Sequence, residues 1–255
     1  MTKSKLVAQT GCGQAVYVVS GACRRPWRDF ERYLSASEQQ RVLTYSRDVD
    51  KCRFAVGRVL LRSLLSRELG VPPACVPIEI SGTGKPFAVG TRIQASISHS
   101  GDFAAGAISC DTSIGIDVEC WSSTQLVESL SGMFCSGSEL QAVASVPVSR
   151  RNVELLRLWT LKEAYAKALG TGIGDIRGHK FRLGDDGTAS AASRPPGEAW
   201  QFRTIADDGR YMLAVALRGA PGIEVKEISA SVIEAEPGSG WLVDRSFGMA
   251  AELSC

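Results

Sequence analysis

The sequence contains no run of apolar residues approaching the ~20 that a membrane-spanning helix needs. Two lysines stand near its start, but the apolar stretch that follows is interrupted by Gln9, Thr10, Gly11 and Gly13. A secretory signal requires an unbroken apolar region after its charged start. We therefore expect a cytoplasmic protein without a membrane anchor or an export signal.

An excess of charge of one sign is also missing. Lysine and arginine number 29 and aspartate and glutamate 27, which gives a formal net charge of +2 at pH 7. Proteins that bind nucleic acids or membrane surfaces concentrate positive charge to match those polyanions. The balance argues against both partners, so any polyanionic ligand should be small and held by local charge.

Histidine is scarce, and the cysteines are not paired in motifs. The two histidines and eight cysteines form no C-x-x-C element and no cluster of the zinc-binding type. A chain of 255 residues, 44% of them hydrophobic, buries enough apolar surface to fold without disulfides. We expect reduced, buried cysteines, in one large domain or two small ones.

What the sequence does contain is an irregular mixture of helix and strand patterns. Capping boxes begin helices at Ser35 and Ser136, and helical periodicity runs through 56–69 and 152–169, each followed by glycine. A Gly/Pro loop is expected over 81–92. Short strands are predicted at 16–19, 93–98, 103–109, 114–119, 181–183, 201–205 and 211–217. Without regular strand–helix alternation, we expect an α+β fold, and the apolar strand that ends each half is a faint indication of duplication.

Segment 114–119 (IGIDVE) places two carboxylates on one face of a strand. Alternation directs its three aliphatic side chains to the core and Gly115, Asp117 and Glu119 to the other face. Neighbouring carboxylates repel unless a cation lies between them, and oxygen ligands without histidine or cysteine suit Mg²⁺. We expect Gly115 to leave room for a ligand. The alternative is the solvated face of an edge strand.

Segment 158–167 (LWTLKEAYAK) aligns Trp159, Glu163 and Lys167 on one helical stripe, because they are four residues apart. Glu163 is suited to be a third metal ligand, with Lys162 and Lys167 supplying charge for a pyrophosphate. An ordinary amphipathic helix accounts for the same spacing.

Segment 96–101 (SISHSG) leads a strand into a turn with a histidine among hydroxyls. Ser98 or Ser100 with His99 would suit a small hydrolase, but no G-x-S-x-G elbow accompanies them. His99 can instead donate to a phosphate, as can Lys85 in the G-K-P of 84–86. That element is not a P-loop, because G-x-x-x-x-G-K-[ST] is absent.

Taken together, the segments 84–86, 97–101, 114–119 and 159–167 closely resemble, in order and spacing, the 4′-phosphopantetheinyl transferases, in particular their larger Sfp-type branch. The resemblance covers roughly residues 30–217. It implies two similar α+β halves about a pseudo-twofold axis, residues 1–112 and 113–255, with coenzyme A in the cleft between them. A monomer is expected, since the duplication supplies both walls of that cleft.

The same resemblance implies the residues of the site. Asp117, Glu119 and Glu163 would hold Mg²⁺ against the coenzyme A pyrophosphate, with Glu163 also the candidate general base and Lys167 on phosphate. The other implied coenzyme A ligands are Lys162 near the phosphates, Lys85 and Pro86 at the adenine, Ser98 and His99 at phosphate oxygens, and Arg41 and Arg53 at the 3′-phosphate. Arg58 is a further candidate there, because Glu38 occupies the other expected basic position of the first helix.

In the implied reaction, a serine of an apo acyl or peptidyl carrier protein attacks the β-phosphorus of coenzyme A and 3′,5′-ADP leaves. The carriers of polyketide, nonribosomal peptide and fatty acid synthases all fit this scheme. Leu126 and Leu130 are candidates for docking the carrier, and the ring of Trp159 is expected to pack under the metal-binding helix. The alternative from another class is a non-catalytic module that binds coenzyme A or a carrier protein.

Overall fold

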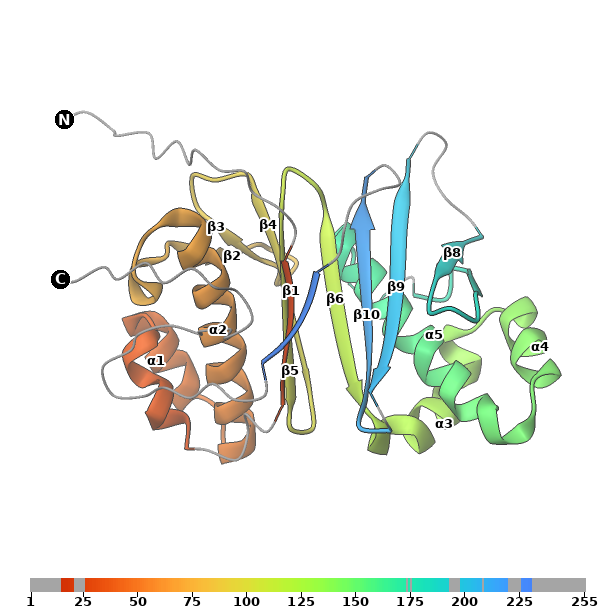
Figure 1. Ribbon diagram of the computed structural model, residues 1–255. Helices are drawn as coiled ribbons and strands as arrows, with labels where there is room; N and C mark the ends of the chain where they lie inside the picture. The colour runs from red at the N-terminus through yellow and green to blue at the C-terminus, as the bar shows by residue number, and fades with distance from the viewer. Residues whose placement is uncertain are drawn as a thin grey trace.

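Two sheets stand face to face at the centre of the molecule, with helices covering the outer side of each (Figure 1). The computed structural model describes residues 15–20, 26–172, 174, 176–192, 198–207, 209–219 and 226–230, of which 15–20 and 226–230 are described by their backbone alone. Helices and mainly antiparallel strands make this an α+β fold, as the sequence predicts.

The first half builds its layer around a long helix. Its elements are β1 (Ala15–Ser20), η2 (Trp27–Tyr33), α1 (Ala36–Leu43), α2 (Asp48–Leu69), η3 (Pro73–Cys75), β2 (Ile78–Ile80), β3 (Pro86–Ala88), β4 (Ile93–Ser100) and β5 (Phe103–Cys110). The predicted capping box at Ser35 starts α1, and Gly70 ends α2 in the left-handed conformation. Leu60 and Leu64 of α2 lie directly against Gly106 of β5, where no side chain intervenes.

The second half has a corresponding set of elements. They are β6 (Ile114–Cys120), η4 (Trp121–Ser123), α3 (Thr124–Phe134), α4 (Gly137–Ser145), α5 (Val148–Leu169), β7 (Phe181–Leu183), β8 (Ala189–Ala191), β9 (Trp200–Asp207) and β10 (Tyr211–Arg218). The predicted capping box at Ser136 begins α4. Helix α5 packs against β6 and β10, and Gly170 terminates it in the left-handed conformation.

The connection order of the two halves repeats. In each, a strand is followed by helices, a short hairpin and a long hairpin, and the first strand pairs antiparallel with the last. This produces the orders β1-β5-β4 and β6-β10-β9. The expected twofold axis and the division at 112/113 stay predictions. Strand β11 (Lys226–Ala230), although it follows the second half, pairs in parallel with β1 in the sheet of the first half.

The space between the sheets is filled by small and aliphatic side chains. Ile114, Ile116 and Val118 of β6 point into it and meet Ala105 and Ala107 of β5. The predicted alternation of β6 is therefore confirmed, with its aliphatic face at the junction of the two sheets and its acidic face toward α5.

Gly115 corrects one expectation. The sequence suggests that this glycine leaves room for a ligand, but the space above it is occupied by α5. A Cβ placed at Gly115 would stand 1.9 Å from the carbonyl oxygen of Ala164 and 2.5 Å from the amide nitrogen of Ala168. The glycine thus allows strand and helix backbones to touch, which brings the carboxylates of β6 close to the side chains of α5.

The cysteines only partly match the expectation that they are reduced and buried. Cys52 and Cys135 are free and buried, whereas free Cys75 is exposed and free Cys120 is half-buried. Cys110 is disulfide-bonded, so the expectation of reduced thiols is wrong at that position. None of the helices in the described part of the chain is long and apolar enough to cross a bilayer.

Replacing Gly115 with alanine is expected to destabilise the protein by about 3 kcal/mol, because the methyl group meets backbone atoms that cannot rotate away. Urea unfolding followed by far-UV circular dichroism measures the change. Gly132→Ala is the matched control, since nothing lies within 4 Å of its added Cβ and alanine favours the helix by about 0.5–1 kcal/mol. Equal urea midpoints for Gly115→Ala and Gly132→Ala would contradict the close contact between Gly115 and the backbone of α5.

Candidate active site

Asp117 is the most deeply buried of the candidate acids. Only 3% of its surface is exposed. Its Oδ1 accepts hydrogen bonds from Ser98 Oγ (2.6 Å) and from Lys167 Nζ (2.7 Å), whereas its buried Oδ2 has no partner among the described residues. Burial raises the pKa of Asp117, and Lys167 opposes that shift. A buried carboxylate oxygen without a donor is suited to receive a cation.

Glu119, two residues further along β6, is held by hydrogen bonds from three elements. Ser100 Oγ (2.6 Å) and Ser123 Oγ (3.1 Å) donate to its Oε2, and Trp159 Nε1 (3.2 Å) donates to its Oε1. The carboxylate is therefore fixed in orientation without a basic residue within ion-pair distance in the described part of the chain.

Glu163 faces these two acids from α5. Burial raises its pKa to about 7, and the negative charges of Asp117 and then Glu119 add to the shift, while Lys167 opposes it. The three carboxylates are thus close enough to repel one another. No described hydrogen bond or ion pair neutralises Glu163.

This donor set fits Mg²⁺, which takes carboxylate oxygens together with phosphate oxygens of a substrate. The supporting observation is the orphaned, buried Oδ2 of Asp117 next to two further carboxylates. Among the described residues, however, no three histidine, cysteine or acidic side chains are already gathered in a metal-binding arrangement. Phosphate oxygens of a substrate would supply further ligands to such a site.

Lys167 lies beside Asp117. Its Nζ bridges Asp117 and the hydroxyl of Ser98, which lies 3.0 Å away. Ser98 therefore connects the aspartate to the lysine, and its hydroxyl is already engaged rather than free to bind phosphate.

The serines of β4 form a row along the free edge of β6. Ser96 Oγ accepts the amide N–H of Ile116 (3.1 Å), and Ser100 Oγ accepts that of Cys120 (3.1 Å). With Ser98 on Asp117, every second residue from Ser96 to Ser100 bonds to β6. This role was not predicted, although the i, i+2 spacing of the serines indicates that they share one face of the strand.

His99 and Arg53 lie close to each other, and His99 also lies near Lys167. The ring of His99 reaches solvent, yet partial burial lowers its pKa, and the charges of Lys167 and Arg53 contribute. Arg53 donates to the carbonyl oxygen of Gly101 (3.1 Å) and pairs with Asp50 (3.3 Å). A neutral histidine beside an arginine retains a donor for a phosphate.

The other arginines considered for the 3′-phosphate lie differently. Arg41 is exposed, with its guanidinium over the ring of Tyr45. Arg58 is mostly buried beside Glu38, which also receives Arg62 Nε at 2.6 Å. Glu38 thus serves to neutralise arginines inside the first half. No described contact connects Arg41 to the carboxylates of the site.

Lys85 covers the other end of the free edge of β6. Its Nζ donates to the carbonyl oxygens of Ile114 (3.2 Å) and Ala168 (3.3 Å), and burial lowers its pKa. The ammonium group therefore connects the first half to β6 and to the end of α5. Pro86 begins β3 as a buried residue, and the role of both residues at the adenine stays a prediction.

Lys162 does not lie with the other candidates, which corrects the expectation that it binds coenzyme A. It is fully buried on a different face of α5, where its Nζ donates to Glu139 Oε2 (3.0 Å) and to the carbonyl oxygens of Ile176 and His179. Glu139 also accepts the amide N–H of Phe181 at 2.9 Å. Lys162 therefore ties α4 and the segment before β7 to α5.

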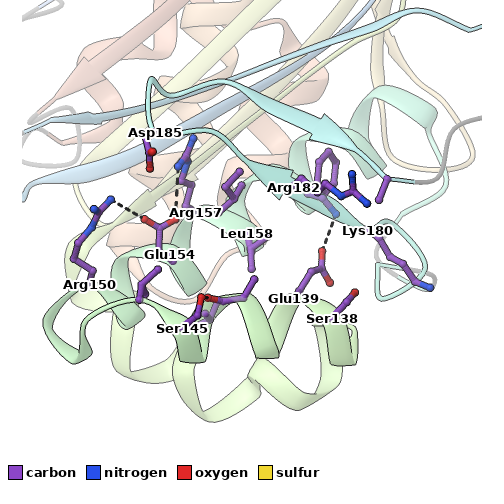
Figure 2. Close-up of a pocket in the computed structure, with 16 residues that line it drawn as sticks. Ser138, Glu139, Ser145, Arg150, Glu154, Arg157, Leu158, Lys180, Arg182 and Asp185 are labelled. Carbon is purple, nitrogen blue, oxygen red and sulfur yellow. Dashed lines mark hydrogen bonds and ion pairs between the residues drawn. The ribbon is translucent and has the colours of Figure 1, made fainter.

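A cavity of about 460 Å³ lies on this side of the second half, between α4, the first turns of α5 and β7 (Figure 2). Glu139 and Glu154 line it, and Figure 2 shows Glu154 paired with Arg150 and Arg157. None of the four residues Asp117, Glu119, Glu163 and Lys167 is part of its wall. This cavity is separate from the candidate active site.

Leu126 and Leu130, the candidates for carrier docking, differ in exposure. Leu126 of α3 is 62% exposed, whereas Leu130 is partly buried against the core of the second half. The ring of Trp159 contacts Phe134 edge-on, with centroids 5.2 Å apart. Trp159 was expected only to pack, and its hydrogen bond to Glu119 is an additional finding.

Matches to known proteins cover most of the chain. Residues 113–216 match the 4′-phosphopantetheinyl transferase superfamily, and residues 22–111 match the 4′-phosphopantetheinyl transferase N-terminal region. The 4′-phosphopantetheinyl transferase HetI of Nostoc sp. is 32% identical over 75% of this chain and 81% of its own. The 4′-phosphopantetheinyl transferase psf-1 of Bacillus pumilus is 31% identical over 80% of this chain and 84% of its own. A Bacillus subtilis 4′-phosphopantetheinyl transferase is 26% identical over 76% and 87%. Since these matches extend over both halves, the chain belongs to the 4′-phosphopantetheinyl transferase superfamily.

Proposed function

We propose that this protein moves the 4′-phosphopantetheine arm of coenzyme A to a serine of an apo carrier protein, with Mg²⁺ held by Asp117, Glu119 and Glu163. The observation that carries the proposal is that the charges of Asp117 and Glu119 act on Glu163, beside Lys167, while one buried oxygen of Asp117 has no hydrogen-bond partner among the described residues. The carriers proposed are those of polyketide, nonribosomal peptide or fatty acid synthases.

The chemistry is a displacement at phosphorus. The serine oxygen of the carrier bonds to the β-phosphorus while the bond from that phosphorus to the oxygen of 3′,5′-ADP breaks. Mg²⁺, when bound, offsets the negative charge of the pyrophosphate. Lys167 places a second positive charge near the same oxygens, where a fixed charge in a water-poor site stabilises the transition state.

Glu163 is the proposed acceptor of the serine proton. A general base works best when its pKa lies near the working pH, and the pKa of Glu163 is about 7 in the protein alone. Cation binding lowers that pKa, so proton acceptance and cation binding compete at this carboxylate. His99 and Arg53 are proposed to hold the 3′-phosphate, because the two side chains lie near each other beside Lys167 and both retain N–H donors.

The carrier is proposed to dock on α3 through Leu126, whose exposed side chain lies in the first turn of that helix, soon after Glu119 along the chain. We further propose a cytoplasmic monomer. The alternative, a module that only binds coenzyme A or a carrier, is disfavoured because binding alone does not require three converging carboxylates and a lysine.

The defining measurement is the intact mass of an apo carrier protein after incubation with this protein, coenzyme A and Mg²⁺. We expect the serine to gain one phosphopantetheine arm, and we expect EDTA to prevent the gain because the carboxylates then lack their cation. Unchanged mass across peptide, polyketide and fatty acid carriers, with coenzyme A still bound, would instead support the binding module.

Glu163→Gln is expected to abolish transfer in that assay and to stabilise the cation-free protein in a pH-dependent way. The pKa of Glu163 rises from 4.5 to about 7 on folding, so the wild-type protein loses stability as the pH increases through this window. Glutamine has no such loss. In EDTA, the melting temperature of Glu163→Gln should therefore exceed that of wild type at pH 8 and approach it at pH 4.5. Glu79→Gln, at an exposed strand position, is the control. A difference that does not vary with pH would be evidence against the buried charge.

Two lysine variants of the same helix separate catalysis from structure. Lys167→Met should lower kcat/KM by about 100-fold, since it removes a charge facing the reacting phosphate. Lys162→Met should lower the free energy of unfolding by about 3 kcal/mol, because it leaves the buried Glu139 without its cation, and should change kcat/KM of the folded protein little. Steady-state kinetics and urea unfolding on both proteins give the comparison. A loss of transfer in Lys162→Met at full folding would restore Lys162 to the site.

A further inference from the structure

Glu119 differs from the other two acids because its carboxylate is almost fully occupied by hydrogen-bond donors. A carboxylate offers about four acceptor positions. Ser100 and Ser123 use the two on Oε2, and Trp159 uses one on Oε1. With the donors of the described residues counted, one position, on Oε1, is left for any further ligand.

Two of these donors are themselves held in place. Ser100, the last residue of β4, donates to Glu119 and simultaneously accepts the amide N–H of Cys120, so its hydroxyl cannot rotate freely. The indole of Trp159 is packed edge-on against Phe134, which is 1% exposed at the end of α3. The donors therefore approach Glu119 from fixed directions, one from the first half of the fold and one from α5.

We infer that Ser100 and Trp159 are positioning residues that orient the Glu119 carboxylate for cation binding. The inference rests on the proposed function, because it assumes that Glu119 is a cation ligand. Partners that hydrogen-bond to a ligating carboxylate fix its direction and typically contribute 10–100-fold to metal affinity. Since Ser100 comes from β4, the site is complete only when the two halves are packed together.

The test measures Mn²⁺ binding to protein saturated with coenzyme A, by the electron paramagnetic resonance signal of free Mn²⁺. Ser100→Ala and Trp159→Phe are each expected to weaken Mn²⁺ binding at least tenfold, with coenzyme A affinity in EDTA unchanged. Ser100→Thr, which keeps the hydroxyl, is expected to restore binding to within about threefold of wild type.

Matched controls exist in the chain for both variants. Ser96→Ala removes a hydroxyl of the same row that accepts the backbone N–H of Ile116 instead of orienting a carboxylate. Trp200→Phe removes a similar hydrogen bond outside the site, because the indole N–H of Trp200 donates to Glu198 at 3.1 Å, compared with 3.2 Å for Trp159 and Glu119. Both controls are expected to bind Mn²⁺ like wild type. In a Glu119→Ala background, Ser100→Ala is expected to cause no further loss.

The possible results separate this inference from the proposed function. If Glu119→Ala weakens Mn²⁺ binding but Ser100→Ala and Trp159→Phe behave like their controls, the positioning role is refuted and the cation site stands. If Glu119→Ala itself binds Mn²⁺ as tightly as wild type, the cation role of Glu119 fails and the inference fails with it. A further loss from Ser100→Ala in the Glu119→Ala background would show that Ser100 acts by another route, which also overturns the proposal.

Discussion

The free edge of β6 is the feature on which the rest of the structure depends. This strand ends the three-stranded sheet, so one row of its peptide groups faces the first half without a neighbouring strand. Unpaired buried peptide groups are costly. Side chains of the first half substitute for the missing strand: Lys85 bonds to the carbonyl oxygen of Ile114, Ser96 to the N–H of Ile116 and Ser100 to the N–H of Cys120. The contact that joins the halves is therefore also the contact that surrounds Asp117 and Glu119.

Much of this was predictable because the relevant patterns are local. Capping boxes fix where α1 and α4 begin, and strand alternation places Ile116 in the core and Asp117 on the opposite face. The helical stripe placed Trp159, Glu163 and Lys167 on one face of α5, and in the structure Trp159 and Lys167 bond to Glu119 and Asp117 of β6. The prediction for 56–69 began too late, because α2 starts at Asp48 in a charged segment without apolar periodicity. The segment 81–92, expected to be a loop, contains β3, whose three residues are too few to show alternation.

What could not be predicted depends on contacts between distant segments. Helical spacing places Lys162 and Lys167 on different faces of α5, but only the packing shows that Lys162 meets Glu139 of α4 and Lys167 meets Asp117 of β6. Gly115 similarly suggested an opening for a ligand, and only the packing of α5 shows that a backbone fills it. Residues of one short motif can thus differ in role: Lys162 fixes α5 to α4, whereas Lys167 joins α5 to β6.

The parallel pairing of β11 with β1 has a consequence for truncation of the chain after β10. Because β1 lies between β11 and β5, the strand that follows the second half shields an edge of the sheet in the first. An exposed strand edge is a template for pairing with other chains. A shortened chain that ends after β10 would expose the edge of β1. Self-association of such a chain would therefore occur through the first half, although the deleted residues follow the second half.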